Sequence, residues 1–127
     1  PIPARTDEGR MTVTLHVCIT CRANEPANDA TLPMGARLHR ALTDLGAPDG
    51  VRIVPVECLS ACGAGATVAL SGPGRWSYAY GHMTEADAPE ILQGAAAFAT
   101  TPDGIVPWRA RPLIFRKRSL ARIPPIG

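Results

Sequence analysis

The sequence has no apolar stretch approaching the about 20 residues that a membrane-spanning helix needs, so we expect no membrane span. Residues 1–10 also lack the apolar centre of a secretory signal peptide, which predicts a cytoplasmic protein. The chain has only four cysteines, and structural disulfides are rare in the reducing cytosol. These cysteines therefore indicate a metal site or a redox role rather than structural cross-links.

Catalytic patterns are missing from the sequence as well. We recognise neither a Ser, His and Asp arrangement nor a pair of carboxylates suited to acid–base chemistry. The hydrophobic content of 46% and the charged content of 19% are typical of a globular domain. We therefore expect one small domain that is not itself an enzyme.

Acidic residues are absent after Asp103, whereas eleven Asp and Glu outnumber seven Arg before Gly104. The resulting basic extension also holds large apolar residues, so we expect it to lie against the domain or against a partner. Complementary charge favours docking of an acidic redox partner protein. A surface extension that only caps the sheet is the equal alternative, and the aromatic residues lack the pattern of a nucleic-acid module. The six basic residues are Arg109, Arg111, Arg116, Lys117, Arg118 and Arg122.

Hydrophobic periodicity predicts an α/β domain with the order β-α-β-β-β-α and a mixed sheet with helices packed on it. The first predicted helix begins near Pro33 and ends at Gly46. We expect a flexible arm at 1–10, the domain at 11–104 and a Pro/Arg-rich extension at 105–127. The other predicted elements are strands at 11–17, 51–57, 67–70 and 76–80, with a hairpin at 71–74 and a helix at 85–99 that begins with a capping box.

The four cysteines form two close pairs, each at the end of a predicted strand. Two residues separate Cys18 from Cys21, three separate Cys58 from Cys62, and 36 residues lie between the pairs. In a parallel βαβ unit both strands end at the same edge of the sheet. The crossover therefore brings the two pairs together, and all four cysteines are candidate ligands of one metal centre.

Three kinds of site fit this arrangement. A 2Fe–2S cluster needs four thiolates, and a four-cysteine zinc site needs the same number. A thiol–disulfide oxidoreductase is a weaker interpretation, because a polar loop with Pro26 follows Cys21 and no helix start is evident there. Cysteine count and topology leave the cluster and zinc level, and four unliganded buried cysteines are the plain alternative.

Other polar residues near the cysteines have simpler interpretations. His16 could replace a cysteine ligand, but with four cysteines present we expect it to pack beside the site. Arg22 could offset the negative charge of a cluster or lie on the surface as an ordinary arginine. His39 is expected on a solvated helix face and His82 in a turn.

One segment of the sequence resembles a known family. Cys58-Leu-Ser-Ala-Cys62-Gly-Ala-Gly-Ala, at the end of an apolar strand, resembles the second cysteine pair of the thioredoxin-like 2Fe–2S ferredoxins. The small 2Fe–2S subunit of bacterial NADH:quinone oxidoreductase carries a similar pattern. The likeness in layout covers residues 11 to about 100, although these families space the first pair more widely than Cys18 and Cys21. It implies a thioredoxin-like fold, a 2Fe–2S cluster on four cysteines, one-electron transfer and a homodimer.

The whole chain, with Trp108-Arg-Ala-Arg-Pro and Arg122-Ile-Pro-Pro, is also similar to a family of small bacterial proteins described as metal-binding. The link of that family with cobalamin-biosynthesis genes implies a role in corrin or cobalt reduction. With both resemblances we predict a 2Fe–2S electron carrier. A zinc protein acting as a metal carrier or interaction module is the alternative, and a thiol–disulfide oxidoreductase is the third.

Overall fold

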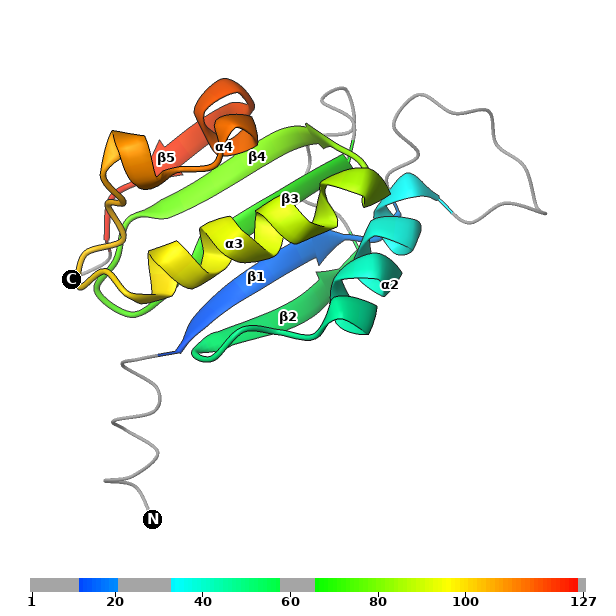
Figure 1. Ribbon diagram of the computed structural model, residues 1–127, viewed down its shortest axis with the longest axis horizontal. Helices are drawn as coiled ribbons and strands as arrows, with labels where there is room; N and C mark the ends of the chain where they lie inside the picture. Colours follow the sequence, from blue (N-terminus) through cyan, green and yellow to red (C-terminus); the bar gives the residue numbers. More distant parts are fainter. Residues whose placement is uncertain (1–11, 21–32, 58–65, 126–127) are drawn as a thin grey trace, which may run out of the picture.

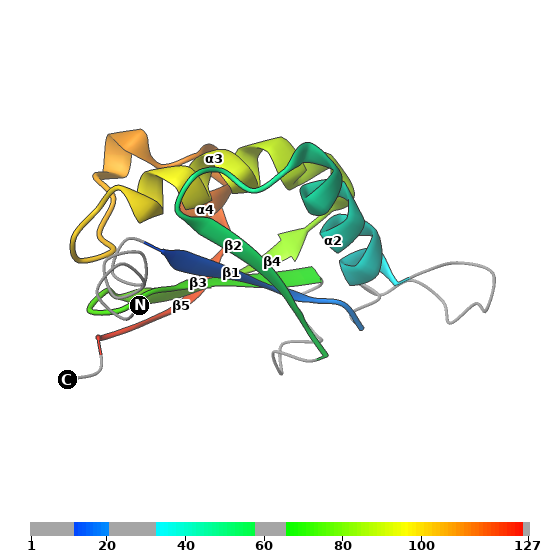
Figure 2. The same ribbon diagram turned by 90° about the horizontal axis from the view of Figure 1, so that it is seen from below.

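The computed structural model describes residues 12–20, 33–57 and 66–125, and every structural statement below concerns these residues. They form a five-stranded mixed sheet in the order β2-β1-β3-β4-β5, with the helices gathered on one face (Figures 1 and 2). The elements are β1 (Val13–Cys18), α2 (Met34–Leu45), β2 (Val51–Val56), β3 (Ala66–Ser71), β4 (Ser77–Met83), the 3-10 turn η2 (Glu85–Asp87), α3 (Ala88–Ala99), the 3-10 turn η3 (Trp108–Ala110), α4 (Leu113–Lys117) and β5 (Ser119–Ile123).

The predicted parallel unit is present in the structure. β1 and β2 run parallel, with Leu15 opposite Ile53 and Cys18 opposite Val56, and α2 makes the crossover between them. α2 ends at Gly46, whose φ of 89° suits glycine and whose N–H donates to the Leu42 carbonyl. Both parallel strands therefore end at the same edge of the sheet, as the sequence predicts.

The core lies between the sheet and the helices. Alternate residues of β1 point to the helices, so Val13, Leu15 and Val17 are fully buried against α2 and α3. Phe98 of α3 and Leu38 of α2 fill the centre of this layer. No helix among the described residues is both long and apolar enough to cross a membrane.

The predicted last helix of the domain is divided. Thr84 and Asp87 form the expected capping box, in which the Thr84 backbone N–H donates to the Asp87 carboxylate over 2.9 Å. A 3-10 turn follows over Glu85–Asp87, and α3 proper begins at Ala88 with Pro89 in its first turn. Proline is accepted there because the first N–H groups of a helix have no partner within it.

The C-terminal extension lies against the domain, which is one of the two positions expected for it. Ile114 and Phe115 of α4 are buried on the sheet and α3. β5 then pairs antiparallel with β4, with Ala121 opposite Ala79, and becomes the edge strand of the sheet. The sequence pattern did not predict this fifth strand.

Candidate functional site

Cys18 is the last residue of β1, and its side chain is 4% exposed. Its thiol lies 3.7 Å from the carbonyl oxygen of Glu57, to which it can donate, and 3.9 Å from the hydroxyl of Thr20. It is a free cysteine within the described part of the chain. A buried thiol thus lies at the edge of the sheet where both parallel strands end.

The residues after β1 are tied to the end of β2. The Ile19 N–H donates to the Val56 carbonyl over 2.9 Å, and the Thr20 hydroxyl donates to the carbonyl of Glu57. Glu57 directly precedes Cys58 in the sequence. The described residues nearest to Cys58 along the chain therefore lie beside Cys18.

The chain re-enters the sheet on the other side of Cys18. β3 begins at Ala66 and is the second neighbour of β1, with Val68 opposite Val17. β2 and β3 consequently flank the end of β1, and residues 58–65 connect these two strands. The predicted ligands Cys58 and Cys62 fall in that connection, so its two described ends lie on either side of Cys18.

The first turn of α2 also meets Cys18. A Cβ atom placed on Gly35 would stand 1.8 Å from the carbonyl oxygen of Cys18 and 3.2 Å from the Cα of Ile19. The residues that follow segment 21–32 therefore rest on the backbone of Cys18. This contact is made by the carbonyl group of Cys18 and not by its thiol, so it does not bear on whether a helix start stabilises a thiolate.

Gly35 is the site residue that the sequence reasoning missed. Its only signal in the sequence is a glycine in the first turn of a helix that is otherwise made of better helix formers. A glycine there costs helix stability, so its presence indicates a close approach of another backbone. The identity of that backbone follows only from the tertiary structure.

Four of the predicted site residues lie outside the described residues: Cys21, Arg22, Cys58 and Cys62. Among the residues that the structure describes, no group of three or more His, Cys, Asp or Glu side chains is placed to hold a metal ion. The ligand set of four cysteines therefore stays a prediction. What the described residues provide is Cys18 and the chain ends that surround it.

His16 lies two residues before Cys18, on the face of the sheet away from the helices. Its Nε2 is 3.2 Å from the hydroxyl of Ser71 on the neighbouring strand. Burial, followed by the positive charge of Arg52, lowers the pKa of His16 below its usual 6.5. The neutral imidazole packed on Ser71 agrees with the expected packing role.

Comparisons with known proteins give a family and a fold. The model of a family described as "Protein of unknown function (DUF1636)" matches residues 15–125. No curated protein matches the chain. Among solved structures, a thioredoxin-like [2Fe-2S] ferredoxin from Aquifex aeolicus is similar over 91% of this chain and 96% of its own, with 17% sequence identity and a TM-score of 0.56. This likeness confirms the predicted thioredoxin-like fold.

Proposed function

The chain belongs to the DUF1636 family, and we propose that it is a small ferredoxin-like protein that carries single electrons on a 2Fe–2S cluster. The proposed ligands are the thiolates of Cys18, Cys21, Cys58 and Cys62. One observation carries the proposal: the described ends of both cysteine-bearing segments, 21–32 with its preceding Thr20 and 58–65, lie around Cys18, whose thiol is buried. Four thiolates from two short segments can then meet at one edge of the sheet.

The chemistry of the described residues fits such a group. Cys18 is shielded from solvent, and shielding is one of the factors that set the potential of a cluster. The Thr20 hydroxyl and the Ile19 N–H bind carbonyl groups at the end of β2, so the chain directly after Cys18 is held there. When bound, a 2Fe–2S cluster supplies a reversible one-electron couple, and the protein fixes its ligands and limits the access of water.

The fold and the lack of catalytic patterns support an electron carrier over an enzyme. The similar solved structure is that of a ferredoxin, and the sequence has no recognisable acid–base or nucleophile arrangement. We propose a cytoplasmic carrier that passes electrons to a partner protein. Corrin or cobalt reduction as the destination rests on the family resemblance alone, as does a homodimer.

Metal analysis of the full-length protein, purified without oxygen, tests the proposal. We expect visible absorption from iron–sulfur charge transfer and about two iron and two acid-labile sulfide per chain. A colourless protein with about one zinc per chain would show the four-cysteine zinc site instead. A metal-free protein whose cysteines undergo thiol–disulfide exchange would show the oxidoreductase.

A further inference from the structure

The C-terminal extension presents a basic surface with an exposed aromatic residue. Trp108 is 58% exposed and Leu113 is 54% exposed, which are high values for large apolar side chains. The guanidinium groups of Arg111 and Arg116 lie over the Trp108 ring, and Arg109 follows Trp108 in the chain. We call this set the Trp108 surface, and its members are Trp108, Arg109, Arg111, Leu113 and Arg116.

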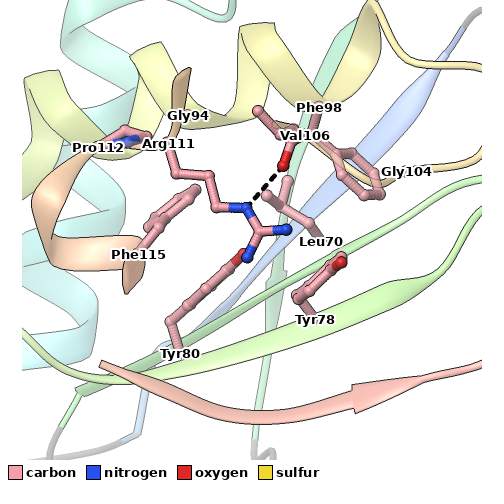
Figure 3. A pocket seen from close by; sticks show the side chains of 10 residues that line it. All are labelled: Leu70, Tyr78, Tyr80, Gly94, Phe98, Gly104, Val106, Arg111, Pro112 and Phe115. Carbon is pink, nitrogen blue, oxygen red and sulfur yellow. Dashed lines mark hydrogen bonds between the residues drawn. The ribbon is translucent and has the colours of Figure 1, made fainter. Parts of the chain in front are cut away.

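Arg111 is held in the middle of this surface. Its Nε donates to the Val106 carbonyl over 2.7 Å (Figure 3). Its guanidinium carbon lies 5.4 Å from the Trp108 ring and 5.9 Å from the Tyr78 ring. Among the ion pairs of the described residues, none includes Arg111. Within the described part of the chain, the terminal nitrogens of its guanidinium are therefore free to bind an incoming carboxylate.

A small cavity lies beneath Arg111. Leu70, Phe98 and Phe115 form its apolar walls, and Tyr78 and Tyr80 bring hydroxyl groups to it (Figure 3). The Tyr78 side chain is 6% exposed, and its hydroxyl is buried without a hydrogen-bond partner in the structure. Burial raises the pKa of Tyr80, so its hydroxyl stays a donor at any physiological pH.

Arg116 contacts the same tryptophan ring as Arg111. Its guanidinium carbon is 5.7 Å from the Trp108 ring and one terminal nitrogen donates to the Arg109 carbonyl over 3.1 Å. Its Nε is buried without a hydrogen-bond partner in the structure. Arg111 and Arg116 thus both lie beside Trp108, in an extension that contains no acidic residue after Asp103.

We propose that the Trp108 surface docks an acidic segment of a partner protein, and that one Asp or Glu side chain of this segment enters the mouth of the cavity and pairs with Arg111. Carboxylates accept paired hydrogen bonds from guanidinium groups. Trp108 and Leu113 provide the apolar contact beside the ion pair. Tryptophan and arginine are the residue types that most often dominate the energy of protein interfaces.

A protein partner fits this surface better than a small molecule or a nucleic acid. The cavity holds only about 10 Å³, far below the range of most small-molecule sites. A nucleic acid would need to stack a base on Trp108, whose ring already has the guanidinium groups of Arg111 and Arg116 within 6 Å. A carboxylate that pairs with Arg111 at the mouth needs neither room inside the cavity nor a free ring face.

This surface is separate from the Cys18 edge. Tyr78 of β4 lies opposite Leu70 of β3, and Leu70 lies opposite Leu15 of β1. Tyr78 is therefore two strands away from β1, at the level of Leu15, which precedes Cys18 by three residues. The docking proposal therefore does not depend on which metal the cysteines hold. Metal content and docking can be measured independently.

Fluorescence of Trp108 tests the proposal. The chain has two tryptophans, so Trp76→Phe leaves Trp108 as the only one. Titration of this full-length protein with a synthetic peptide of Glu and Leu should give a saturable change that weakens as salt is added. Replacing Glu by Gln in the peptide, or Arg111→Gln in the protein, should weaken binding about tenfold or more.

Lys117→Gln is the matched control, because it removes one exposed positive charge from α4 outside the Trp108 surface. It should weaken binding less than twofold.

Equal losses of affinity for Lys117→Gln and Arg111→Gln would overturn the proposal, as would equal binding of the Gln peptide and the Glu peptide. A stronger effect of sodium acetate at the same carboxylate concentration would assign the site to a free small carboxylate. Tighter binding of a single-stranded oligonucleotide would assign it to nucleic acid. Either result also overturns the proposal.

Discussion

Gly35 and Cys18 touch through their backbones. A Cβ atom on Gly35 would lie 1.8 Å from the carbonyl oxygen of Cys18, closer than two nonbonded atoms can approach. The first turn of α2 can therefore rest on the end of β1 only because residue 35 has no side chain. This contact fixes the residues after segment 21–32 against the thiol-bearing end of β1.

Gly35→Ala should consequently disturb the candidate metal centre. The methyl group must displace α2 or the backbone of Cys18, which we expect to cost about 1–3 kcal/mol of unfolding free energy despite the better helix propensity of alanine. We also expect the iron content per chain to fall. Thermal unfolding and iron analysis of the same preparation measure the two effects.

Gly94→Ala is the matched control for this substitution. It places a methyl group within a helix, 2.2 Å from the Phe115 ring, away from Cys18. It should lower stability as well, but the iron bound per folded chain should stay at the wild-type value. If both variants lose iron equally, the Gly35 contact has no special role at the site.

Cys18→Ser tests the thiol itself. Serine keeps the size of the side chain but is a poor ligand for soft metal centres, so we expect visible absorption and iron content below about one tenth of wild type. Ser71→Ala on the neighbouring strand is the control, because it removes a hydroxyl from the same sheet without removing a thiol. Retention of a full complement of iron by Cys18→Ser would exclude Cys18 as a ligand.

The parts of the fold that the sequence predicted have strong local patterns. Val13, Leu15 and Val17 alternate with polar residues because one face of β1 is buried, so the strand and its end at Cys18 could be predicted. The parallel pairing with β2 then followed from the helix between the strands. The convergence of the two strand ends therefore needed no tertiary information.

The fifth strand could not be predicted in this way. All five residues of β5 are exposed, so no alternation of buried and exposed positions marks Ser119–Ile123 as a strand. It is held by backbone pairing with β4 and by the contacts of Arg118, neither of which leaves a pattern in the sequence. The role of Gly35 was hidden for a related reason, because it depends on a backbone that lies far away along the chain.

The stability of the protein should depend on His16 below neutral pH. Burial and Arg52 lower the pKa of His16 in the folded state, while the unfolded chain keeps the usual value of about 6.5. The unfolded state therefore binds more protons below this pH, and the unfolding free energy should fall as the pH drops from about 6.5 through the lower folded-state pKa.

His16→Gln should reduce this pH dependence. Denaturant unfolding at pH values from neutral to mildly acidic measures the slope, and the variant should show a shallower decline than wild type. His39→Gln, which removes a histidine from α2, is the control for the loss of a histidine elsewhere. The change of its unfolding free energy with pH is compared with that of His16→Gln. If His16→Gln retains the full wild-type slope, titration of His16 does not contribute.

Arg118 anchors the C-terminal extension to the start of α3. One terminal nitrogen of Arg118 lies 2.7 Å from the carboxylate of Asp87 and donates to the His82 carbonyl over 3.1 Å. The same carboxylate accepts the N–H and the hydroxyl of Thr84. The Asp87 side chain is only 14% exposed, so this pair is shielded more than most surface ion pairs.

We therefore expect Arg118→Gln to lower the unfolding free energy by about 1 kcal/mol, and Asp87→Asn by somewhat more because the capping box is weakened too. A double-mutant cycle should give a coupling energy of about 0.5–1 kcal/mol, since the Arg118 side chain is one third exposed and partly screened.

Because the Gly81 N–H donates to the Arg118 carbonyl, amide hydrogen exchange between β4 and β5 should also quicken in Arg118→Gln. Lys117→Gln, which changes the neighbouring exposed charge, should leave both measurements near wild type. A coupling energy near zero would mean that β5 is held by strand pairing alone.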